Sequence, residues 1–217
     1  MLIVFDLDGT LVDSRRDLAE SANALLADYG APPLAEDVIG SMVGDGAPVL
    51  VRRACVAAGL SSVPADALRR FLDLYEARLL NNTKPYPGML ETLDGAATKG
   101  TLAVLTNKPG AASRRILEGT GLLDFFHQLV CGDGPWARKP EPEGLRWLME
   151  QTRESPASTL FVGDSSVDLR TARAAGVPIC LARYGFGYLS VPIRELTATE
   201  RVIDAPLELL KLLQQDA

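Results

Sequence analysis

Two aspartates, Asp6 and Asp8, stand two residues apart directly after the apolar run Met1–Phe5. An apolar run without polar alternation predicts a strand buried on both faces, and Gly9 provides a turn behind it. Side chains alternate along extended backbone, so both carboxylates project to the same side just past the strand. That end of a strand is where ligands bind in α/β sheets. Two carboxylates so placed repel each other unless a divalent cation or a shared proton holds them.

Polar residues also follow other predicted strands. They are Thr106 and Asn107 after the run 101–105, and Asp164 after the run 159–162 with Asp168 four residues on, while Lys139 stands separately before that run. Magnesium prefers a few carboxylates together with waters and other oxygen ligands, which suits Asp6 and Asp164. The four-residue spacing of Asp164 and Asp168 predicts one shared face of a helix turn. Each feature taken alone has a plainer explanation, such as a helix cap or a solvated loop. The prediction of one site at the strand ends therefore rests on their combination.

The chain alternates between strand and helix patterns, with one helical interruption. Residues 15–83 show three helical patterns, at 15–29, 47–58 and 64–80, and no strand signal. After Pro85 the alternation predicts strands at 101–105, 129–131, 159–162 and 178–181, each followed by a helix, the last at 206–214. This order predicts an α/β fold: a doubly wound parallel sheet with a Rossmann-like core and an inserted small helical cap domain. We assign residues 1–14 and 84–217 to the core and 15–83 to the cap, with hinges at 12–14 and 81–85.

Composition excludes several classes of protein. The 217 residues suit one large domain or a core with a smaller unit, and the net charge of −6 comes without any basic block. We therefore expect no nucleic-acid partner, and the absence of a long apolar run predicts no membrane partner. Cys55, Cys131 and Cys180 form no CxxC pair, which favours reduced thiols in the cytoplasm. The single histidine, His127, disfavours histidine-based triads and metal sites.

The stretch Phe5-Asp-Leu-Asp-Gly-Thr-Leu-Val-Asp-Ser14 resembles the first motif of the haloacid dehalogenase superfamily, in its phosphatase branch. The other three motifs of that family are matched in the same order at Thr106, Lys139 and Gly163-Asp164. The resemblance therefore covers essentially the whole predicted core.

The resemblance implies a role for each matched residue. Asp6 corresponds to the nucleophile that forms an aspartyl-phosphate, and Asp8 to the general acid that protonates the leaving oxygen and later activates water. Thr106 and the Asn107 amide correspond to groups that bind phosphoryl oxygens, and Lys139 to the cation that neutralises them. The implied Mg²⁺ ligands are the Asp6 carboxylate, the Asp8 backbone carbonyl and Asp164, with Asp168 as a further ligand or as a partner of one.

Three features separate the branches of the family. Dehalogenases lack an acid at the position of Asp8, which is present here. Phosphonatases use a cap lysine, and residues 1–83 contain no lysine. β-Phosphoglucomutases use a cap histidine, and the single histidine of this chain, His127, lies outside the cap. The nearest resemblance is to the phosphoglycolate phosphatase branch. It rests on several stretches, namely Asp17-Leu18-Ala19, Ala22-Asn23, Val43-Gly44-Asp45-Gly46 with Arg53-Ala54, Tyr86-Pro87-Gly88, Thr106-Asn107-Lys108-Pro109 and Tyr184–Tyr188.

These observations predict a Mg²⁺-dependent phosphomonoester hydrolase, a monomer or homodimer, that acts on a small phosphorylated metabolite, with 2-phosphoglycolate as the expected substrate. Another small sugar phosphate, pyrophosphate, or a non-catalytic binding module are the alternatives. Two cap features are candidates for substrate binding. The Gly44–Gly46 loop either closes over the substrate or is a tight turn, and Arg53 either binds a substrate carboxylate or is a solvated helix residue.

Overall fold

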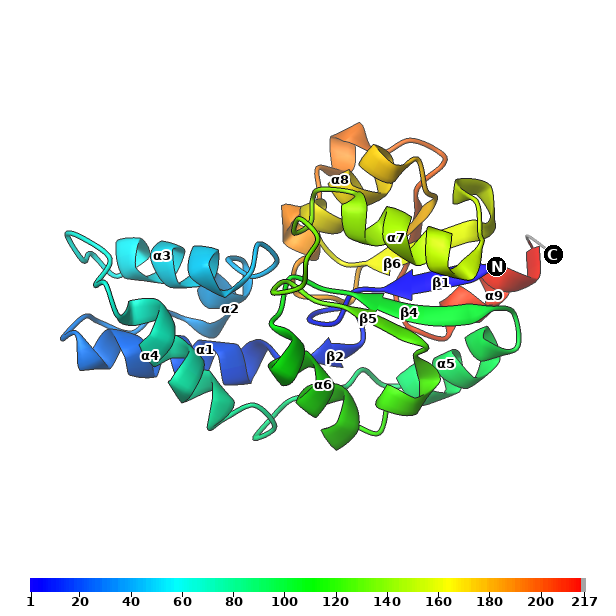
Figure 1. The fold of residues 1–217 in the computed structure, drawn as a ribbon. Helices are drawn as coiled ribbons and strands as arrows, with labels where there is room; N and C mark the ends of the chain where they lie inside the picture. Colours follow the sequence, from blue (N-terminus) through cyan, green and yellow to red (C-terminus); the bar gives the residue numbers. More distant parts are fainter. Residues whose placement is uncertain (216–217) are drawn as a thin grey trace.

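Six parallel strands form one sheet at the centre of the computed structural model, which describes residues 1–215 (Figure 1). Across the sheet they are β5 (Gln128–Val130), β4 (Thr101–Leu105), β1 (Leu2–Phe5), β6 (Thr159–Gly163), β7 (Ile179–Ala182) and β8 (Arg201–Ile203). The chain builds outward from β1 in both directions, so the strand order reverses beside β1. Ligands bind at such a reversal in open α/β sheets, which directs attention to the end of β1.

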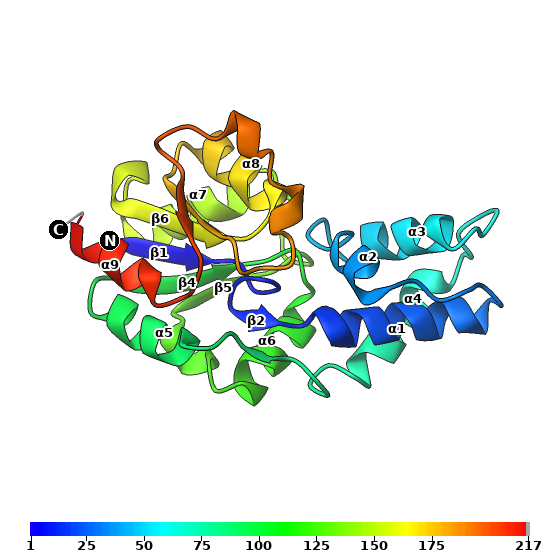
Figure 2. The ribbon, with the colours of Figure 1, turned by 180° about the vertical axis from the view of Figure 1, so that it is seen from behind.

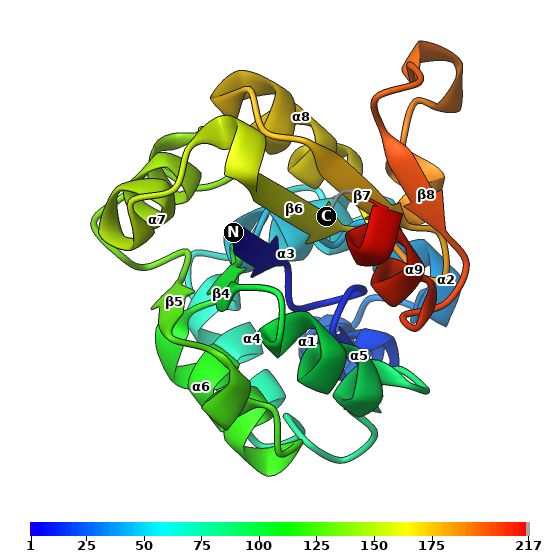
Figure 3. The same ribbon diagram turned by 90° about the vertical axis from the view of Figure 1, so that its right-hand side faces the viewer.

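Alternation along β1 explains how the two faces of the sheet are covered. Ile3 and Phe5 belong to the hydrophobic cluster that includes α5 (Met89–Ala97), α6 (Gly110–Gly119) and α9 (Glu208–Gln215). Leu2 and Val4 belong to the cluster on the other face, with α7 (Glu143–Thr152) and α8 (Ser166–Ala175). Figure 3 shows these two helix layers on opposite sides of the sheet. A strand buried on both faces needs an uninterrupted apolar sequence, as β1 has.

Four further helices lie beside the core, beyond the carboxyl ends of the strands (Figure 1). They are α1 (Arg15–Asp28), α2 (Glu36–Gly40), α3 (Ala47–Ala57) and α4 (Ala67–Glu76). Their apolar faces pack on one another, with Leu25, Leu26 and Phe71 buried. Within residues 1–215, no helix is both long enough and apolar enough to cross a membrane.

Two short connecting strands join these helices to the core. β2 (Val12–Asp13) pairs antiparallel with β3 (Lys84–Pro85), and Figure 2 shows β2 leading directly into α1. Just beyond them, the buried carboxylate of Asp17 accepts hydrogen bonds from Asn82 and Thr83, from both backbone N–H groups and both side chains, at 2.7–3.0 Å. The outgoing and returning segments are thereby held together at one point.

The predicted fold class is confirmed, while several element boundaries differ. The sixth strand, β8, was missed because only Ile203 of its three residues is buried, which leaves no apolar run to recognise. The short helix α2 lies in a stretch that we expected to be irregular. Helix α4 is shorter than the predicted 64–80, because the flanking residues form turns despite their helical propensity. Short 3₁₀ turns at Leu123–Phe125, Pro156–Ser158, Tyr188–Ser190 and Ile193–Glu195 complete the described elements.

We expect Asp17→Ala to destabilise the protein by at least about 1.5–3 kcal/mol, because it leaves buried donors without their charged acceptor. The melting temperature would then fall by roughly 3–12 °C. Asp28→Ala on the same helix is the control, because Asp28 makes only an exposed ion pair with Arg70.

The same contact predicts a pH dependence. Burial alone would raise the pKa of Asp17, but the hydrogen bonds from Asn82 and Thr83 outweigh it and lower this pKa. The stabilisation is therefore present at neutral pH and is lost as the pH falls below the ordinary aspartate value of 3.8. Denaturant titrations should show the stability of Asp17→Ala approaching that of wild type at low pH. Asp28→Ala should show no such convergence. Equal stability of Asp17→Ala and wild type at neutral pH would contradict this account.

Candidate active site

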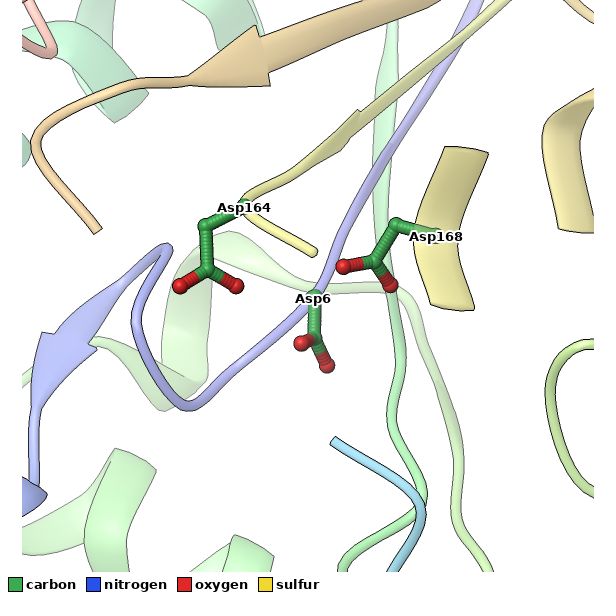
Figure 4. Close-up of side chains that lie close together, drawn as sticks. All are labelled: Asp6, Asp164 and Asp168. Carbon is green, nitrogen blue, oxygen red and sulfur yellow. The ribbon is translucent and has the colours of Figure 1, made fainter. Parts of the chain in front are cut away.

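Three buried carboxylates converge at the carboxyl end of the sheet (Figure 4). Asp6 follows β1, Asp164 follows β6, and Asp168 lies in the first turn of α8. One oxygen from each lies within 4.8 Å of the others, and all three side chains are buried. The ends of two strands and the start of α8 bring these acids together, although Asp6 lies 158 or more residues before the other two in the chain.

This cluster carries more negative charge than the protein neutralises. Burial raises the pKa of Asp6 to about 7, with Lys139 opposing the shift. Burial also raises the pKa of Asp164 well above its ordinary value, and the neighbouring Asp168 and Asp6 raise it further. Buried oxygen ligands with surplus negative charge are the donor set that a hard divalent cation such as Mg²⁺ prefers. The residues present therefore fit such an ion.

Glycines shape the surroundings of Asp164. Gly9 has φ +84°, and a Cβ there would lie 2.0 Å from Asp164 Oδ2. A Cβ on Gly185 would lie 2.2 Å from the Gly9 carbonyl oxygen. The Gly187 N–H donates to Asp164 Oδ2 at 2.7 Å. The glycine-rich stretch around 184–188, noted in the sequence only as a family resemblance, thus holds one of the acids in place.

Lys139 bridges two of the acids. Its Nζ lies 2.8 Å from Asp6 Oδ1 and 2.6 Å from Asp168 Oδ1, and its side chain is buried. The other oxygen of Asp168 accepts from the N–H and hydroxyl of Ser165, which caps α8. Asp168 therefore anchors the lysine to the start of a helix.

The predicted placement of Asp164 and Asp168 on one helix turn is wrong. Helix α8 begins at Ser166, with Ser165 as its N-cap, so Asp164 belongs to the strand end. The two acids meet because a strand end and the following helix turn face the same point, and not because of helical spacing. A four-residue separation across a strand-to-helix turn looks identical in the sequence.

Asp8 lies in a second polar group, on the side of α4. It accepts a hydrogen bond from the Ser14 hydroxyl, and its Oδ2 lies 2.9 Å from Lys108 Nζ. Lys108 Nζ also donates to the Tyr75 hydroxyl at 2.8 Å. Burial works against the charge of Lys108, but Asp8 and Tyr75 outweigh it and raise the pKa of the lysine. Burial raises the pKa of Tyr75 to about 12, so its hydroxyl keeps its proton at neutral pH.

Sequence reasoning missed Lys108 and Tyr75 as site residues. Tyr75 fits the apolar face of α4 and was assigned to packing within the helical unit. Lys108 appeared only as part of the Thr106–Pro109 stretch. A lysine directly after a strand end that already carries two candidate site residues was the available signal.

Thr106 and Asn107 follow β4, and both are buried. The Asn107 amide nitrogen donates to the carbonyl oxygens of Gly44 and Lys139, each at 2.9 Å. Both hydrogens of this amide are engaged, so it joins the core to the Gly44–Gly46 loop. This differs from the expected contact between the Asn107 amide and a phosphoryl oxygen.

A cavity of about 280 Å³ lies between this sheet edge and the helical unit. Its core side is polar, with Asp6, Asp8, Thr106, Asn107 and Lys108. Its helical side is mainly apolar and includes Leu18, Val43, Leu50, Phe71, Leu72 and Tyr75, with Gly44 and Gly46 at the loop. This volume suits a small ligand whose polar end faces the core.

Arg53 does not line this cavity. Its guanidinium lies 2.7 Å from Asp45 Oδ2 and donates to the Met42 carbonyl at 3.0 Å. Arg53 thus braces the loop that carries Gly46. Gly46 itself has φ +88°, and a Cβ there would lie 3.3 Å from the Asn107 carbonyl oxygen, so the loop sits close against the core.

A doubly wound sheet, an acidic cluster at its point of reversal and a helical unit inserted after β1 define an α/β enzyme whose site lies at the carboxyl ends of the strands. The profile of haloacid dehalogenase-like hydrolases matches residues 3–182. A phosphoglycolate phosphatase of Rhodospirillum rubrum is 42% identical, over 90% of this chain and 84% of that protein. A phosphoglycolate phosphatase of Haemophilus influenzae is 37% identical, over 98% and 97%.

Solved structures agree with this relationship. The crystal structure of a predicted phosphoglycolate phosphatase from Haemophilus somnus matches with a TM-score of 0.87 and 34% identity, over 97% of this chain and 96% of that one. The chain therefore belongs to the haloacid dehalogenase-like hydrolases. It is a phosphatase of that family, and the resemblance to the phosphoglycolate phosphatase branch is confirmed.

Because Arg53 does not line the cavity, we predict that it does not bind the carboxylate of the substrate. We expect Arg53→Ala to lower kcat/KM by no more than about fivefold, and equally on 2-phosphoglycolate and p-nitrophenyl phosphate, because a half-exposed ion pair contributes about 1 kcal/mol or less. Steady-state kinetics on both esters measure this, with the exposed neighbour Arg52→Ala as control. A loss confined to 2-phosphoglycolate would return Arg53 to the substrate site.

Proposed function

We propose that this chain is a Mg²⁺-dependent phosphomonoester hydrolase that works through an aspartyl-phosphate on Asp6 and uses 2-phosphoglycolate as substrate. The observation that carries the proposal is Asp6 itself, paired with Lys139 and lining the cavity next to Asp8. The names of the relatives, at 42% and 37% identity, support the choice of substrate.

In the first half-reaction, an Asp6 oxygen forms a bond to phosphorus and the ester P–O bond breaks. Asp8 gives a proton to the departing oxygen, so that glycolate leaves as an alcohol. In the second half-reaction, Asp8 takes a proton from water, whose oxygen attacks phosphorus and frees the Asp6 carboxylate. Lys139 reduces the repulsion between Asp6 and the phosphoryl oxygens, and the Thr106 hydroxyl donates to one of those oxygens.

Asp6 and Asp164, with the Asp8 backbone carbonyl, are the residues that would hold Mg²⁺. Asp168 lies beside them, where it binds Lys139 and Ser165. When bound, the ion supplies positive charge that stabilises the phosphoryl group during transfer.

We further propose that residues 15–83 act as a cap on a core made of 1–14 and 84–217. The pairing of β2 with β3 and the contact from Asn107 to Gly44 support a unit that closes over the cavity. Closure excludes water from the reacting groups. Free thiols at Cys55, Cys131 and Cys180 support a reducing compartment such as the cytoplasm.

We expect Asp6→Asn to lower kcat by more than about a thousandfold, because an amide is a poor nucleophile. The variant should keep its fold, since asparagine preserves the shape of the side chain. Phosphate release on a panel of small phosphoesters and pyrophosphate measures activity, and a melting curve checks the fold. Appreciable turnover by folded, non-deamidated variant would remove Asp6 from the role of nucleophile, and a preference of wild type for another ester would correct the substrate.

Mg²⁺ should raise the melting temperature of the wild-type protein, because an ion that binds the folded state relieves the repulsion among Asp6, Asp164 and Asp168. EDTA should stop hydrolysis and Mg²⁺ should restore it. Asp164→Asn should lose most of the Mg²⁺-dependent shift, whereas Glu118→Gln, an exposed acid on α6, should retain it. Full activity in metal-free buffer, or an equal shift in both variants, would contradict the proposed ion site.

A further inference from the structure

The cavity holds one cation that the reaction as proposed does not use. Among the described residues that line the cavity, Lys108 is the single lysine or arginine. Two acids at the rim, Asp73 and Glu76, are paired with Arg69 and Arg115. An anionic group on the leaving side of a substrate therefore meets its counter-charge at Lys108.

Lys108 has a donor left for such a group. A lysine ammonium carries three N–H bonds, and here one faces Asp8 and one faces the Tyr75 hydroxyl. The Tyr75 hydroxyl accepts from Lys108, which leaves its own proton to donate. Lys108 and Tyr75 both line the cavity, so together they offer one N–H and one O–H donor to the same acceptor. Two donors on neighbouring atoms match the two oxygens of a carboxylate.

The position of Lys108 also selects where that carboxylate must be. Asp8 has to touch the ester oxygen in order to protonate it, and Lys108 lies one hydrogen bond from Asp8, at 2.9 Å. A group on the carbon next to the ester oxygen therefore comes within reach of Lys108. In 2-phosphoglycolate that group is the carboxylate.

We propose that Lys108 and Tyr75 bind the carboxylate of the leaving group and so select phosphoesters with an acid on the carbon next to the ester oxygen. This inference rests on the proposed function. It gives the core a direct part in substrate choice through Lys108. The cap contributes Tyr75 from α4, so binding of the carboxylate also favours the closed arrangement.

The test compares three esters of similar size: 2-phosphoglycolate, ethyl phosphate with a methyl group in place of the carboxylate, and phosphoethanolamine with a positively charged aminomethyl group there. The measured quantity is the ratio of kcat/KM for 2-phosphoglycolate to kcat/KM for ethyl phosphate. Because Lys108 also touches Asp8, both rates will fall in its variants, and the ratio cancels that shared loss.

We expect Lys108→Met to lower this ratio roughly ten- to a hundredfold, since it removes a hydrogen bond between charged groups. Tyr75→Phe should lower it about tenfold or less, and Lys108→Arg should retain part of it. Wild type should hydrolyse phosphoethanolamine more slowly than ethyl phosphate. Lys108→Met should not show this difference between the two esters. Lys99→Met, an exposed lysine after α5, is the matched control and should keep the wild-type ratio.

Calorimetric binding of glycolate adds a measurement that does not depend on turnover, and Lys108→Met should bind it at least tenfold more weakly. An unchanged ratio in Lys108→Met, with both substrates slowed equally, would limit Lys108 to acting through Asp8 and overturn the inference. Equal hydrolysis of 2-phosphoglycolate and ethyl phosphate by wild type would overturn it too, while leaving the phosphatase intact. Hydrolysis of no phosphoester by wild type would instead reject the proposed function.

Discussion

An excess of buried negative charge at the end of β1 is the constraint on which the site depends. Asp6, Asp164 and Asp168 lie within a few ångströms of one another, and Lys139 neutralises only part of their charge. Charges removed from water are costly unless they are paired, so the Lys139 ammonium group and the N-cap residue Ser165 of α8 offset only part of that cost. The same surplus of negative charge that disfavours the fold gives the cluster the donor set that could hold a metal ion.

The surroundings of the cluster follow from that constraint. Gly9 and Gly185 leave no side-chain atoms where Asp164 must lie, and the Gly187 N–H holds one of its oxygens. One oxygen of Asp168 accepts a hydrogen bond from Lys139 and the other accepts one from Ser165, so Asp168 holds the lysine at the start of α8. Backbone groups and small residues therefore set the positions of the charged side chains, which keeps their distances independent of flexible neighbours.

Of the three residues that follow β4, two connect the sheet with the helical unit α1–α4. Thr106 stays in the core, Asn107 donates to the Gly44 carbonyl, and Lys108 donates to Tyr75 on α4. Both contacts come from the strand end that also lines the cavity beside Asp6 and Asp8. Single hydrogen bonds thus link the helical unit, through Lys108 and Asn107, to Asp8 and to the Lys139 carbonyl.

The sequence alone determined the features that depend on local pattern. Apolar runs located five of the six sheet strands, and the residues following them included Asp6, Asp8, Thr106 and Asp164. Parallel strands of a doubly wound fold end at one edge, so a strand assignment was enough to bring these residues together. The resemblance to the haloacid dehalogenase-like hydrolases drew on the same short stretches and is confirmed.

Only the tertiary structure decided which side chains meet between the helical unit α1–α4 and the sheet. Tyr75 and Lys108 are 33 residues apart and belong to different units, and no periodicity of either segment relates them. Arg53 pairs with Asp45 on the preceding loop, and the helical pattern around Arg53 does not encode this contact. The edge strand β8 needed the neighbouring β7 to supply its hydrogen bonds. Local sequence specifies backbone conformation and burial, whereas pairs of polar side chains depend on packing between distant elements.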